Sequence, residues 1–250
     1  IQINIPKLSE QTKIATFLTA VDEKLTALKQ KKNLLEQYKK GVMQKIFSQE
    51  LRFKDDNGNE YPDWEEKKLG DICEIAKSGG TPISTKREYY DGDIPFLSIS
   101  DMTSQGKYLN YTSNHISELG LVNSSSWIVP ANSIIYSMYA SVGFVAINNI
   151  PLATSQAVLN LILKNSVNTD YIYYTLVDFQ KKIAQFITTG TQGNLNAQSV
   201  KGFILAIPSL SEQTKIANFL SAIDNKINHC QSQIEKTEVW KKGLLQQMFC

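Results

Sequence analysis

The sequence predicts an α+β (mixed α/β) domain flanked by two long α-helices. Three observations support this prediction: a 44-residue segment that occurs twice, a heptad pattern of apolar residues inside each copy, and strand-like apolar runs between the copies. The composition, 42% hydrophobic and 20% charged over 250 residues, is that of an ordinary folded chain. The formal net charge of +2 does not by itself indicate any class of partner.

The repeat joins Ile5–Ser48 to Ile207–Cys250 at a constant offset of 202 residues. The two copies are identical at 21 of 44 positions, and both contain the octapeptide LSEQTKIA, at Leu8–Ala15 and at Leu210–Ala217. Chance does not produce such a match, so we expect both copies to adopt the same local structure.

Each copy is predicted to form a long helix that begins near Ser9 or Ser211. Serine is a favoured N-cap residue, and the acidic residue that follows it, Glu10 or Glu212, suits the positive end of the helix dipole. A helix of about 38 residues would span about 57 Å, which is longer than a small domain requires. Each helix therefore needs a partner.

Apolar residues recur in steps of three and four in both copies, which is typical of a coiled-coil seam. The simplest partner for each helix is the other copy, although each helix could instead lie on the domain between them. Gly41 and Gly243, which should each cost about 1 kcal/mol inside a helix, suggest a kink or a close helix approach. The expected interface residues are Leu18, Val21, Leu25, Leu28, Leu35, Val42, Leu220, Ile223, Ile227, Ile234 and Leu244.

The chain between the copies is predicted to form a domain at residues 51–202, with helical regions at residues 1–50 and 203–250. An amphipathic helix capped by Asn168 or Thr169 would bury Ile172, Leu176, Phe179, Ile183 and Phe186. Arg52–Glu66 looks like a polar linker. Strands are expected at Ile94–Ser98, Ser126–Val129, Ile134–Met138, Gly143–Ile147, Ala157–Leu163 and Phe203–Ile207.

Several longer motifs make a family resemblance specific. They are LSEQTKIA followed by FL and an aspartate, present twice; WEEKKLGDICEIAKSGGTP; IPFLSISDM; IVPANSIIYSMYASVGFVAI; and GTQGNLNAQSVKGFILAIP. Through them the whole chain resembles the specificity (S) subunit of type I restriction-modification systems. The resemblance implies target-recognition domains joined by two long helices in an antiparallel coiled coil, with each domain reading half of a bipartite site in double-stranded DNA.

The same resemblance implies partners and cofactors. The helices would fix the spacing between recognition domains and dock the modification (methyltransferase) subunits. S-adenosylmethionine, ATP and Mg would be used by the modification and restriction (endonuclease/translocase) subunits, with none bound by this chain. A coiled-coil scaffold with a protein- or glycan-binding head is the alternative.

The chain departs from the family pattern because it carries one recognition domain. Its first residues, Ile1–Pro6, align with Phe203–Pro208 and read as the last strand of an absent domain. We expect either the C-terminal half of a two-domain subunit, which is favoured, or a half-subunit that self-associates to restore two domains.

Residues that could contact DNA lie in loops and at strand ends. Glycine-rich turns bring hydroxyls and backbone N–H groups close to phosphates, and amide side chains pair with adenine edges. Plain turns, strand-capping loops and core positions are the alternatives. The candidates are Lys77, Ser78, Gly79, Gly80, Thr81, Lys86, Arg87, Ser100, Tyr136, Ser137, Tyr139, Ser141, Gln192, Asn194 and Asn196.

The first long helix and the residues after it are basic. This surface could contact phosphates or an acidic partner, or it could simply be a solvated helix face. The basic residues are Lys24, Lys29, Lys31, Lys32, Lys39, Lys40, Lys45, Arg52 and Lys54.

No catalytic motif is evident. There is no nucleotide-binding loop, no G-x-G-x-x-G after a strand and no proline-proline-aromatic motif of adenine methyltransferases. Pro62, Asp63 and Glu65–Lys67 superficially resemble a nuclease site, but the spacing is wrong. The three cysteines and two histidines show no metal-site spacing, and no membrane span is expected, so a cytoplasmic, non-catalytic subunit fits best.

Overall fold

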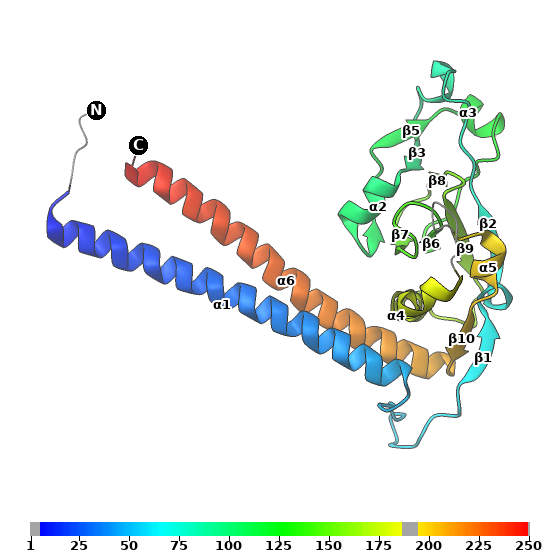
Figure 1. Ribbon diagram of the computed structural model, residues 1–250, viewed down its shortest axis with the longest axis horizontal. Helices are drawn as coiled ribbons and strands as arrows, with labels where there is room; N and C mark the ends of the chain where they lie inside the picture. Colours follow the sequence, from blue (N-terminus) through cyan, green and yellow to red (C-terminus); the bar gives the residue numbers. More distant parts are fainter. Residues whose placement is uncertain (1–5, 187–194, 250) are drawn as a thin grey trace. The chain divides into compact units, whose positions relative to one another are not determined.

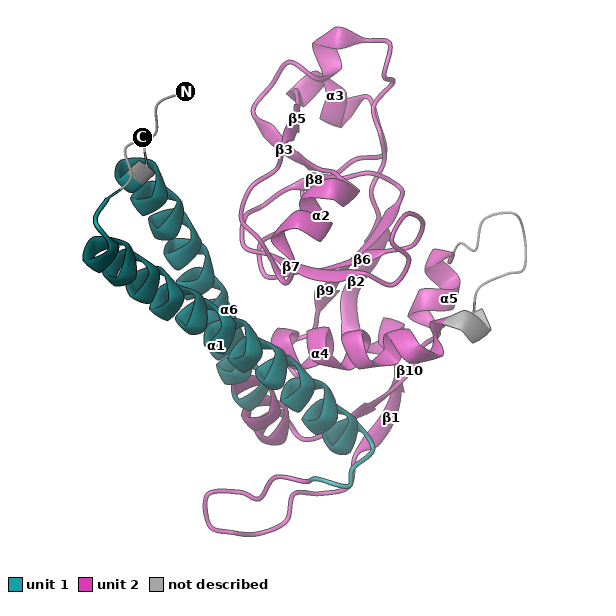
Figure 2. Ribbon diagram, turned by 60° about the vertical axis from the view of Figure 1, so that its left-hand side comes forward, with its two compact units in different colours: residues 1–51, 219–250 teal, residues 52–218 magenta. Residues whose placement is uncertain are grey.

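The computed structural model describes residues 6–186 and 195–249, and the chain divides into two compact units (Figure 2). Unit 1 comprises residues 1–51 and 219–250, and unit 2 comprises residues 52–218. The long helices α1 (Leu8–Phe47) and α6 (Leu210–Phe249) supply unit 1, and the first two turns of α6 belong to unit 2. The predicted mixed α/β domain with flanking long helices is thereby confirmed.

Within unit 1, α1 and α6 run antiparallel (Figure 1). Lys39 forms an ion pair with Asp224 at 2.5 Å, and Lys241 forms one with Asp22. A step of 17 residues forward along α1 therefore corresponds to a step of 17 residues back along α6. Lys39 and Lys241 are equivalent in the repeat, as are Asp22 and Asp224, so the two ion pairs are related by an approximate twofold symmetry.

The apolar seam between the helices lies where the heptad pattern predicts it. Val21, Leu25 and Ile234 form a buried cluster against which Leu28 packs. All eleven predicted interface residues are buried or half-buried. The helices thus pack on each other, as the paired arrangement requires.

Both helices begin one residue earlier than predicted, so Ser9 and Ser211 lie inside them. The cap position of α1 is Lys7, whose side chain makes no capping bond because an ammonium group cannot accept one. In the second copy that position is Ser209, whose Oγ accepts the backbone N–H of Glu212 at 3.4 Å. The octapeptide is the same, and the residue before it decides the cap.

The predicted close helix approach at Gly41 and Gly243 is wrong for the described residues. Both glycines lie inside uninterrupted helices, and a Cβ atom placed on either would meet no atom within 4 Å. No contact in the described chain requires them to be glycine.

Unit 2 contains three sheets among its described residues, and neighbouring strands are antiparallel except for the pairs β3–β8 and β4–β7. The five-stranded sheet has the order β2 (Cys73–Ser78), β9 (Val158–Leu163), β6 (Ile134–Ser137), β7 (Val145–Asn148), β4 (Tyr108–Leu109). The smaller sheets are β5 (Asn114–Ile116), β3 (Ile94–Leu97), β8 (Ala153–Thr154), and β1 (Glu65–Lys68) with β10 (Ile204–Ile207).

Short helices connect these strands. The α-helices are α2 (Ile99–Gln105), α3 (Glu118–Val122), α4 (Thr169–Phe179) and α5 (Ala197–Lys201), and 3₁₀ turns occur at Leu69–Ile72, Arg87–Tyr89 and Gln180–Phe186. Asn168 caps α4 by accepting the N–H of Tyr171. Of the predicted stripe, Ile172, Leu176, Phe179 and Ile183 are buried, and the side chain of Phe186 lies outside the described residues.

The main core packs one face of the five-stranded sheet, with a buried cluster that includes Leu97, Met102, Ile135 and Val158. Five of the six predicted strands form within two residues of their expected bounds. The sixth, Ser126–Val129, contributes only an isolated bridge between Val129 and Leu152.

The predicted linker Arg52–Glu66 is instead anchored to the first turn of α6. Arg52 donates two hydrogen bonds to Glu212, at 2.9 and 3.0 Å, and the indole N–H of Trp64 donates a third at 3.1 Å. The Glu212 side chain is fully buried, and its negative charge raises the pKa of Arg52 through the hydrogen bond. Sequence analysis missed this clamp because its partners are 148 and 160 residues apart. Among the described residues, no helix is long and apolar enough to cross a membrane.

Candidate nucleic-acid interface

One end of the five-stranded sheet gathers loops from several parts of the chain. The strand register pairs Ser78 with Leu159 and Ser137 with Val158. The last residues of β2 and β6 therefore lie beside the first residues of β9. We call this edge the loop end of unit 2.

The β5–β3–β8 sheet brings two further segments to the loop end. Because β3 and β8 are parallel, with Leu97 beside Thr154, their following residues emerge together. Those residues are Ser98–Ser100 at the start of α2 and Ser155–Ala157 before β9. The N–H of Gly80 donates to the carbonyl of Thr154 at 2.9 Å, and the Thr81 hydroxyl donates to Oε1 of Gln156 at 2.7 Å.

The turn after β2 splits into packing residues and exposed residues. Lys77 and Thr81 are exposed and Ser78 is half-exposed, but Gly79 and Gly80 are buried. A Cβ at Gly79 would lie 1.8 Å from the Thr154 carbonyl oxygen, and one at Gly80 would lie 2.7 Å from Ser125. Packing within unit 2 therefore requires glycine at both positions. The prediction that these two buried residues contact DNA is corrected accordingly.

Tyr136 and Ser137 are also removed from the candidates. Both are 0% exposed on β6, and the Ser137 hydroxyl donates to the Ala140 carbonyl at 2.5 Å. The Tyr136 hydroxyl is buried with no hydrogen-bond partner in the described structure, and burial raises its pKa. Neither side chain can reach a base edge without unfolding the strand.

The turn between β6 and β7 does present exposed groups. Tyr139 is 44% exposed, and Ser141 is exposed in a left-handed backbone conformation at φ 53°. The carbonyl of Met138 accepts the N–H of Leu195 at 2.9 Å. This bond brings Asn196 to the loop end.

Asn196 is exposed, and its side-chain oxygen accepts the N–H of Ser199, which caps α5. Its amide N–H groups remain available to a base. Gln192 and Asn194 lie outside the described residues, so their prediction stays open.

Ser100 is exposed in the first turn of α2, which a capping box holds in place. The hydroxyl of Ser98 accepts the N–H of Asp101 at 3.1 Å, and Asp101 accepts the Ser98 N–H at the same distance. Burial alone would raise the pKa of Asp101, but hydrogen bonds from Ser113 and Ser98 more than offset it and lower that pKa. The buried carboxylate thus fixes the segment that carries Ser100.

Cations lie at and beyond the loop end. The Lys77 ammonium sits 5.6 Å from the centre of the Trp127 ring. Lys86 and Arg87 are exposed beside Tyr89, whose carbonyl accepts the N–H of Ser117 just before α3. They lie on the part of unit 2 that is built around the β5–β3–β8 sheet.

Gln156 is the residue that sequence analysis missed. It is exposed at the centre of the loop end, between the exits of β2 and β3. In the sequence Gln156 stands between two apolar runs, and the polar pair Ser155–Gln156 was the only indication of an exposed turn there. Its position follows from the parallel pairing of β3 with β8, which no local pattern reveals.

The exposed groups at the loop end can form hydrogen bonds to polar edges and phosphates. They are Lys77, Thr81, Ser100, Tyr139, Ser141, Gln156 and Asn196, together with the half-exposed Ser78. Within the described part of the chain, no cluster of three or more His, Cys, Asp or Glu side chains could hold a metal ion.

Comparisons with known proteins bear on this arrangement. A family model described as the type I restriction modification DNA specificity domain matches residues 1–37 and 61–237. The type I restriction enzyme MjaIX specificity subunit of Methanocaldococcus jannaschii is 33% identical over 199 residues, which cover 77% of this chain and 45% of that protein. The EcoR124I/EcoR124II specificity subunit of Escherichia coli is 27% identical over 229 residues, 88% of this chain and 52% of that protein.

A solved structure agrees in fold. The S subunit of a type I restriction-modification system from M. genitalium matches with a TM-score of 0.65 at 19% identity, covering 98% of this chain and 62% of that one. This chain spans about half the length of the curated relatives it matches. With its family match covering most of the residues, the chain belongs to the family of type I restriction-modification DNA specificity domains.

Proposed function

We propose that this chain reads one half of a bipartite sequence in double-stranded DNA as a specificity subunit, or part of one, of a type I restriction-modification complex. The observation that carries the proposal is the loop end of unit 2. There, exposed polar side chains from five segments of the chain converge in a member of a DNA specificity family. Sequence-specific readers need such a set of donors and acceptors on a rigid scaffold.

The proposed roles follow from chemistry. Gln156 and Asn196 carry amide groups that can bind adenine edges, and the hydroxyls of Thr81, Ser100 and Tyr139 can bind either bases or phosphates. Lys77, Lys86 and Arg87 would neutralise phosphates and supply affinity that falls with salt. The choice of base would then depend on the loop end. The affinity for DNA would depend on the loop end and on Lys86 and Arg87.

We further propose that the chain is not an enzyme and binds no cofactor itself. Methylation with S-adenosylmethionine and ATP- and Mg-dependent translocation and cleavage would belong to modification and restriction subunits that dock on it. The α1–α6 pair would space recognition domains and hold the modification subunits. We also propose that the chain works in the cytoplasm. The comparisons give no support to a scaffold whose head binds protein or glycan.

Sequence selection from random DNA tests the proposal. The chain, with and without its modification subunit, would be incubated with a random duplex library at about 100 mM salt, because affinities without a stated salt concentration cannot be interpreted. We expect one defined half-site to be enriched. Enrichment of no common sequence by either sample would refute DNA reading by this chain.

A further inference from the structure

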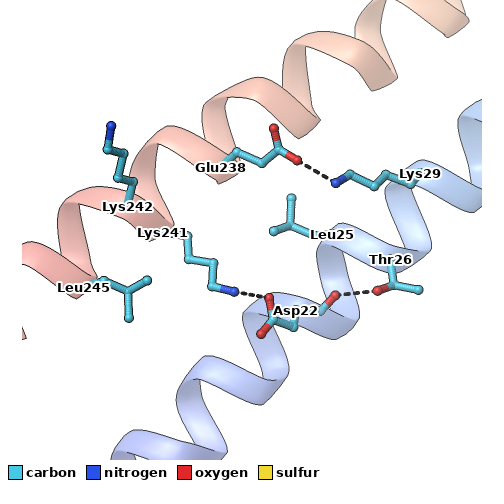
Figure 3. Close-up of a pocket in the computed structure, with 8 residues that line it drawn as sticks. All are labelled: Asp22, Leu25, Thr26, Lys29, Glu238, Lys241, Lys242 and Leu245. Carbon is cyan, nitrogen blue, oxygen red and sulfur yellow. Dashed lines mark hydrogen bonds and ion pairs between the residues drawn. The ribbon is translucent and has the colours of Figure 1, made fainter.

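Two buried side-chain oxygens of unit 2 have no hydrogen-bond partner among the described residues: the hydroxyl of Tyr136 and Oδ1 of Asn160. In the groove of unit 1 that Figure 3 shows, by contrast, Lys241 of α6 reaches across to pair with Asp22 of α1. An unpaired buried acceptor lowers the stability of a fold, because it has lost its bonds to water without replacement. An asparagine at this place in the core therefore needs a reason.

The amide nitrogen of Asn160 joins the two larger sheets of unit 2. Asn160 lies on β9 and is fully buried. Its Nδ2 donates to the carbonyl of Lys77 on β2 at 3.1 Å and to Oγ1 of Thr154 on β8 at 2.8 Å. β2 and β9 belong to the five-stranded sheet, whereas β8 belongs to the β5–β3–β8 sheet. One side chain thus ties the exit of β2 to the exit of β8.

Thr154 is the second member of this contact, and it is also fully buried. Its carbonyl accepts the N–H of Gly80 at 2.9 Å and the hydroxyl of Ser126 at 3.4 Å. The packing is so close that a Cβ at Gly79 would lie 1.8 Å from the same carbonyl oxygen. The turn after β2 therefore packs directly on the end of β8. We call Asn160 and Thr154 the buried junction.

The buried junction adjoins the exposed pair Thr81–Gln156 in the chain. Thr81 follows Gly80, and Gln156 stands two residues after Thr154. The Thr81 hydroxyl donates to Oε1 of Gln156 at 2.7 Å. This bond requires a fixed separation between the turn after β2 and the segment after β8, and the junction joins those two segments.

Stability alone does not explain a polar junction. Replacing both partners of a buried hydrogen bond by apolar groups of the same shape is often nearly neutral. Apolar residues at positions 154 and 160 would also avoid the unpaired oxygen of Asn160. They would supply no directional bond to the carbonyl of Lys77, however, and directional bonds fix one arrangement of a core more strictly than apolar packing does.

We propose that Asn160 and Thr154 are positioning residues that hold Thr81 and Gln156 as one reading unit, which contacts one base pair or two adjacent ones. The inference rests on the proposed function, in which Thr81 and Gln156 contact DNA. Their bonded oxygens are 2.7 Å apart, whereas successive base pairs are about 3.4 Å apart along a duplex. The pair therefore spans at most one base step.

Preorganisation is the physical advantage of this arrangement. Gln156 is exposed, and an unrestrained glutamine side chain loses rotamer freedom when it binds a base. The bond from Thr81 orients the amide before DNA arrives, and Nε2 keeps two N–H groups to donate. A reading side chain that buried neighbours hold in place discriminates between bases more sharply than a loosely held one.

Substitutions at the buried junction test the positioning role. Thr154→Val keeps nearly the same shape but removes the hydroxyl that accepts from Asn160, whereas Thr154→Ser keeps the hydroxyl and is the matched control. Asn160→Leu removes both donated bonds at once. The full chain in each form would select duplexes from a random library at about 100 mM salt. Base preference would be measured at every position of the half-site, alongside the unfolding temperature.

Asn148→Leu controls for a merely structural effect. Asn148 is a second fully buried asparagine of the five-stranded sheet, on β7. Its Nδ2 donates to the carbonyls of Pro130 and Ile150, and its Oδ1 accepts the N–H of Ser133. Ser133 directly precedes β6, so these contacts lie at the end of the sheet opposite the loop end. The variant should lower the unfolding temperature without changing base preference.

The expected result is a local loss of preference. Thr81→Ala and Gln156→Ala should each lose preference at the same position of the half-site or at two adjacent ones. Thr154→Val and Asn160→Leu should lose at least about 5-fold at those positions alone, the lower limit for one good base contact. Thr154→Ser should select the wild-type half-site. Affinity for unrelated duplex DNA, which depends on cations, should stay that of the wild type.

Each contrary outcome identifies what has failed. Wild-type preference at every position in Thr154→Val and Asn160→Leu would overturn the positioning role while leaving the proposed DNA reading intact. Equal loss in Asn148→Leu, or effects of Thr81→Ala and Gln156→Ala more than one base pair apart, would also overturn it. If Asn160→Leu does not fold, Thr154→Val compared with Thr154→Ser decides. A wild-type chain that enriches no half-site would refute the inference together with the proposed function.

Discussion

Single residues in this chain acquire their roles from distant neighbours. Glu10 and Glu212 occupy the same place in the repeated octapeptide LSEQTKIA. Glu10 is exposed, whereas Glu212 is fully buried and accepts hydrogen bonds from Arg52 and Trp64. The local sequence therefore determines the helix, and the surrounding residues of unit 2 determine which of the two carboxylates is buried and hydrogen-bonded.

Replacing Glu212 by alanine should destabilise unit 2 substantially. The change leaves Arg52 and the Trp64 indole without their acceptor, and losing a hydrogen-bonded charge of this kind costs about 2–3 kcal/mol. Glu10→Ala is the matched control and should change stability by no more than about 0.5 kcal/mol. Urea unfolding of both variants measures the difference, and equal effects would argue against the clamp.

Two glycines should respond to alanine in opposite directions. Gly79→Ala forces a methyl group to within 1.8 Å of the Thr154 carbonyl and should destabilise by at least 1–3 kcal/mol. Gly41→Ala meets open space in a helix and should stabilise by about 1 kcal/mol. Thermal unfolding of the two variants reports both signs. A stable Gly79→Ala protein would show that the β2 turn is more loosely packed than described.

Asp101 should make stability depend on acid pH. Its pKa is lowered in the folded chain, because the hydrogen bonds from Ser113 and Ser98 outweigh burial. A carboxylate of this kind contributes stability above its unfolded pKa of about 4, and that contribution is lost as pH falls through the folded pKa. Melting temperatures from pH 6 to pH 3 should fall more steeply for the wild type than for Asp101→Asn, and parallel curves would contradict the assignment.

At the scale of elements, the helix pair offers an internal comparison. The equivalent ion pairs Lys39–Asp224 and Lys241–Asp22 differ in exposure: both partners of the first are 20% exposed, while Asp22 is 54% exposed. Double-mutant cycles should give about 1 kcal/mol of coupling for the first pair and less than half of that for the second. Chemical denaturation measures both, and a larger coupling for Asp22 would contradict the described register.

The elements that the sequence predicted are those with a strong period. The heptad seam gave both long helices, and runs of branched apolar residues gave β3, β6, β7, β9 and β10. β1 was missed because all four of its residues, Glu65–Lys68, are charged and exposed. β4 and β8 have only two residues each, which is too short to show an alternation of apolar and polar residues.

The candidate site was less predictable than the fold. In β6 all four residues are buried, so the rule that alternate strand residues face solvent retained Tyr136 and Ser137 wrongly. Gly79 and Gly80 were predicted to contact DNA because glycine lets the backbone approach a phosphate closely. Packing against Thr154 and Ser125 explains instead why both positions are glycine. Gln156 escaped notice because only the parallel pairing of β3 and β8 places it beside Thr81.

At the scale of the whole molecule, the chain combines unit 2 with a helix pair that is nearly symmetric. It spans about half the length of its curated relatives, and the helix pair carries equivalent Lys–Asp ion pairs at its two ends. The proposed DNA reading depends instead on the loops of unit 2.

The central claim, that the loop end reads bases, is tested most directly by repeating the DNA selection with a triple variant, Thr81→Ala, Tyr139→Ala and Gln156→Ala. Asn165→Ala, exposed after β9 at the opposite end of the sheet, is the control. We predict that the control enriches the wild-type half-site, while the triple variant loses preference at one or more positions by about 1–3 kcal/mol, or roughly 5- to 150-fold. Enrichment of an unchanged half-site by the triple variant would contradict the claim.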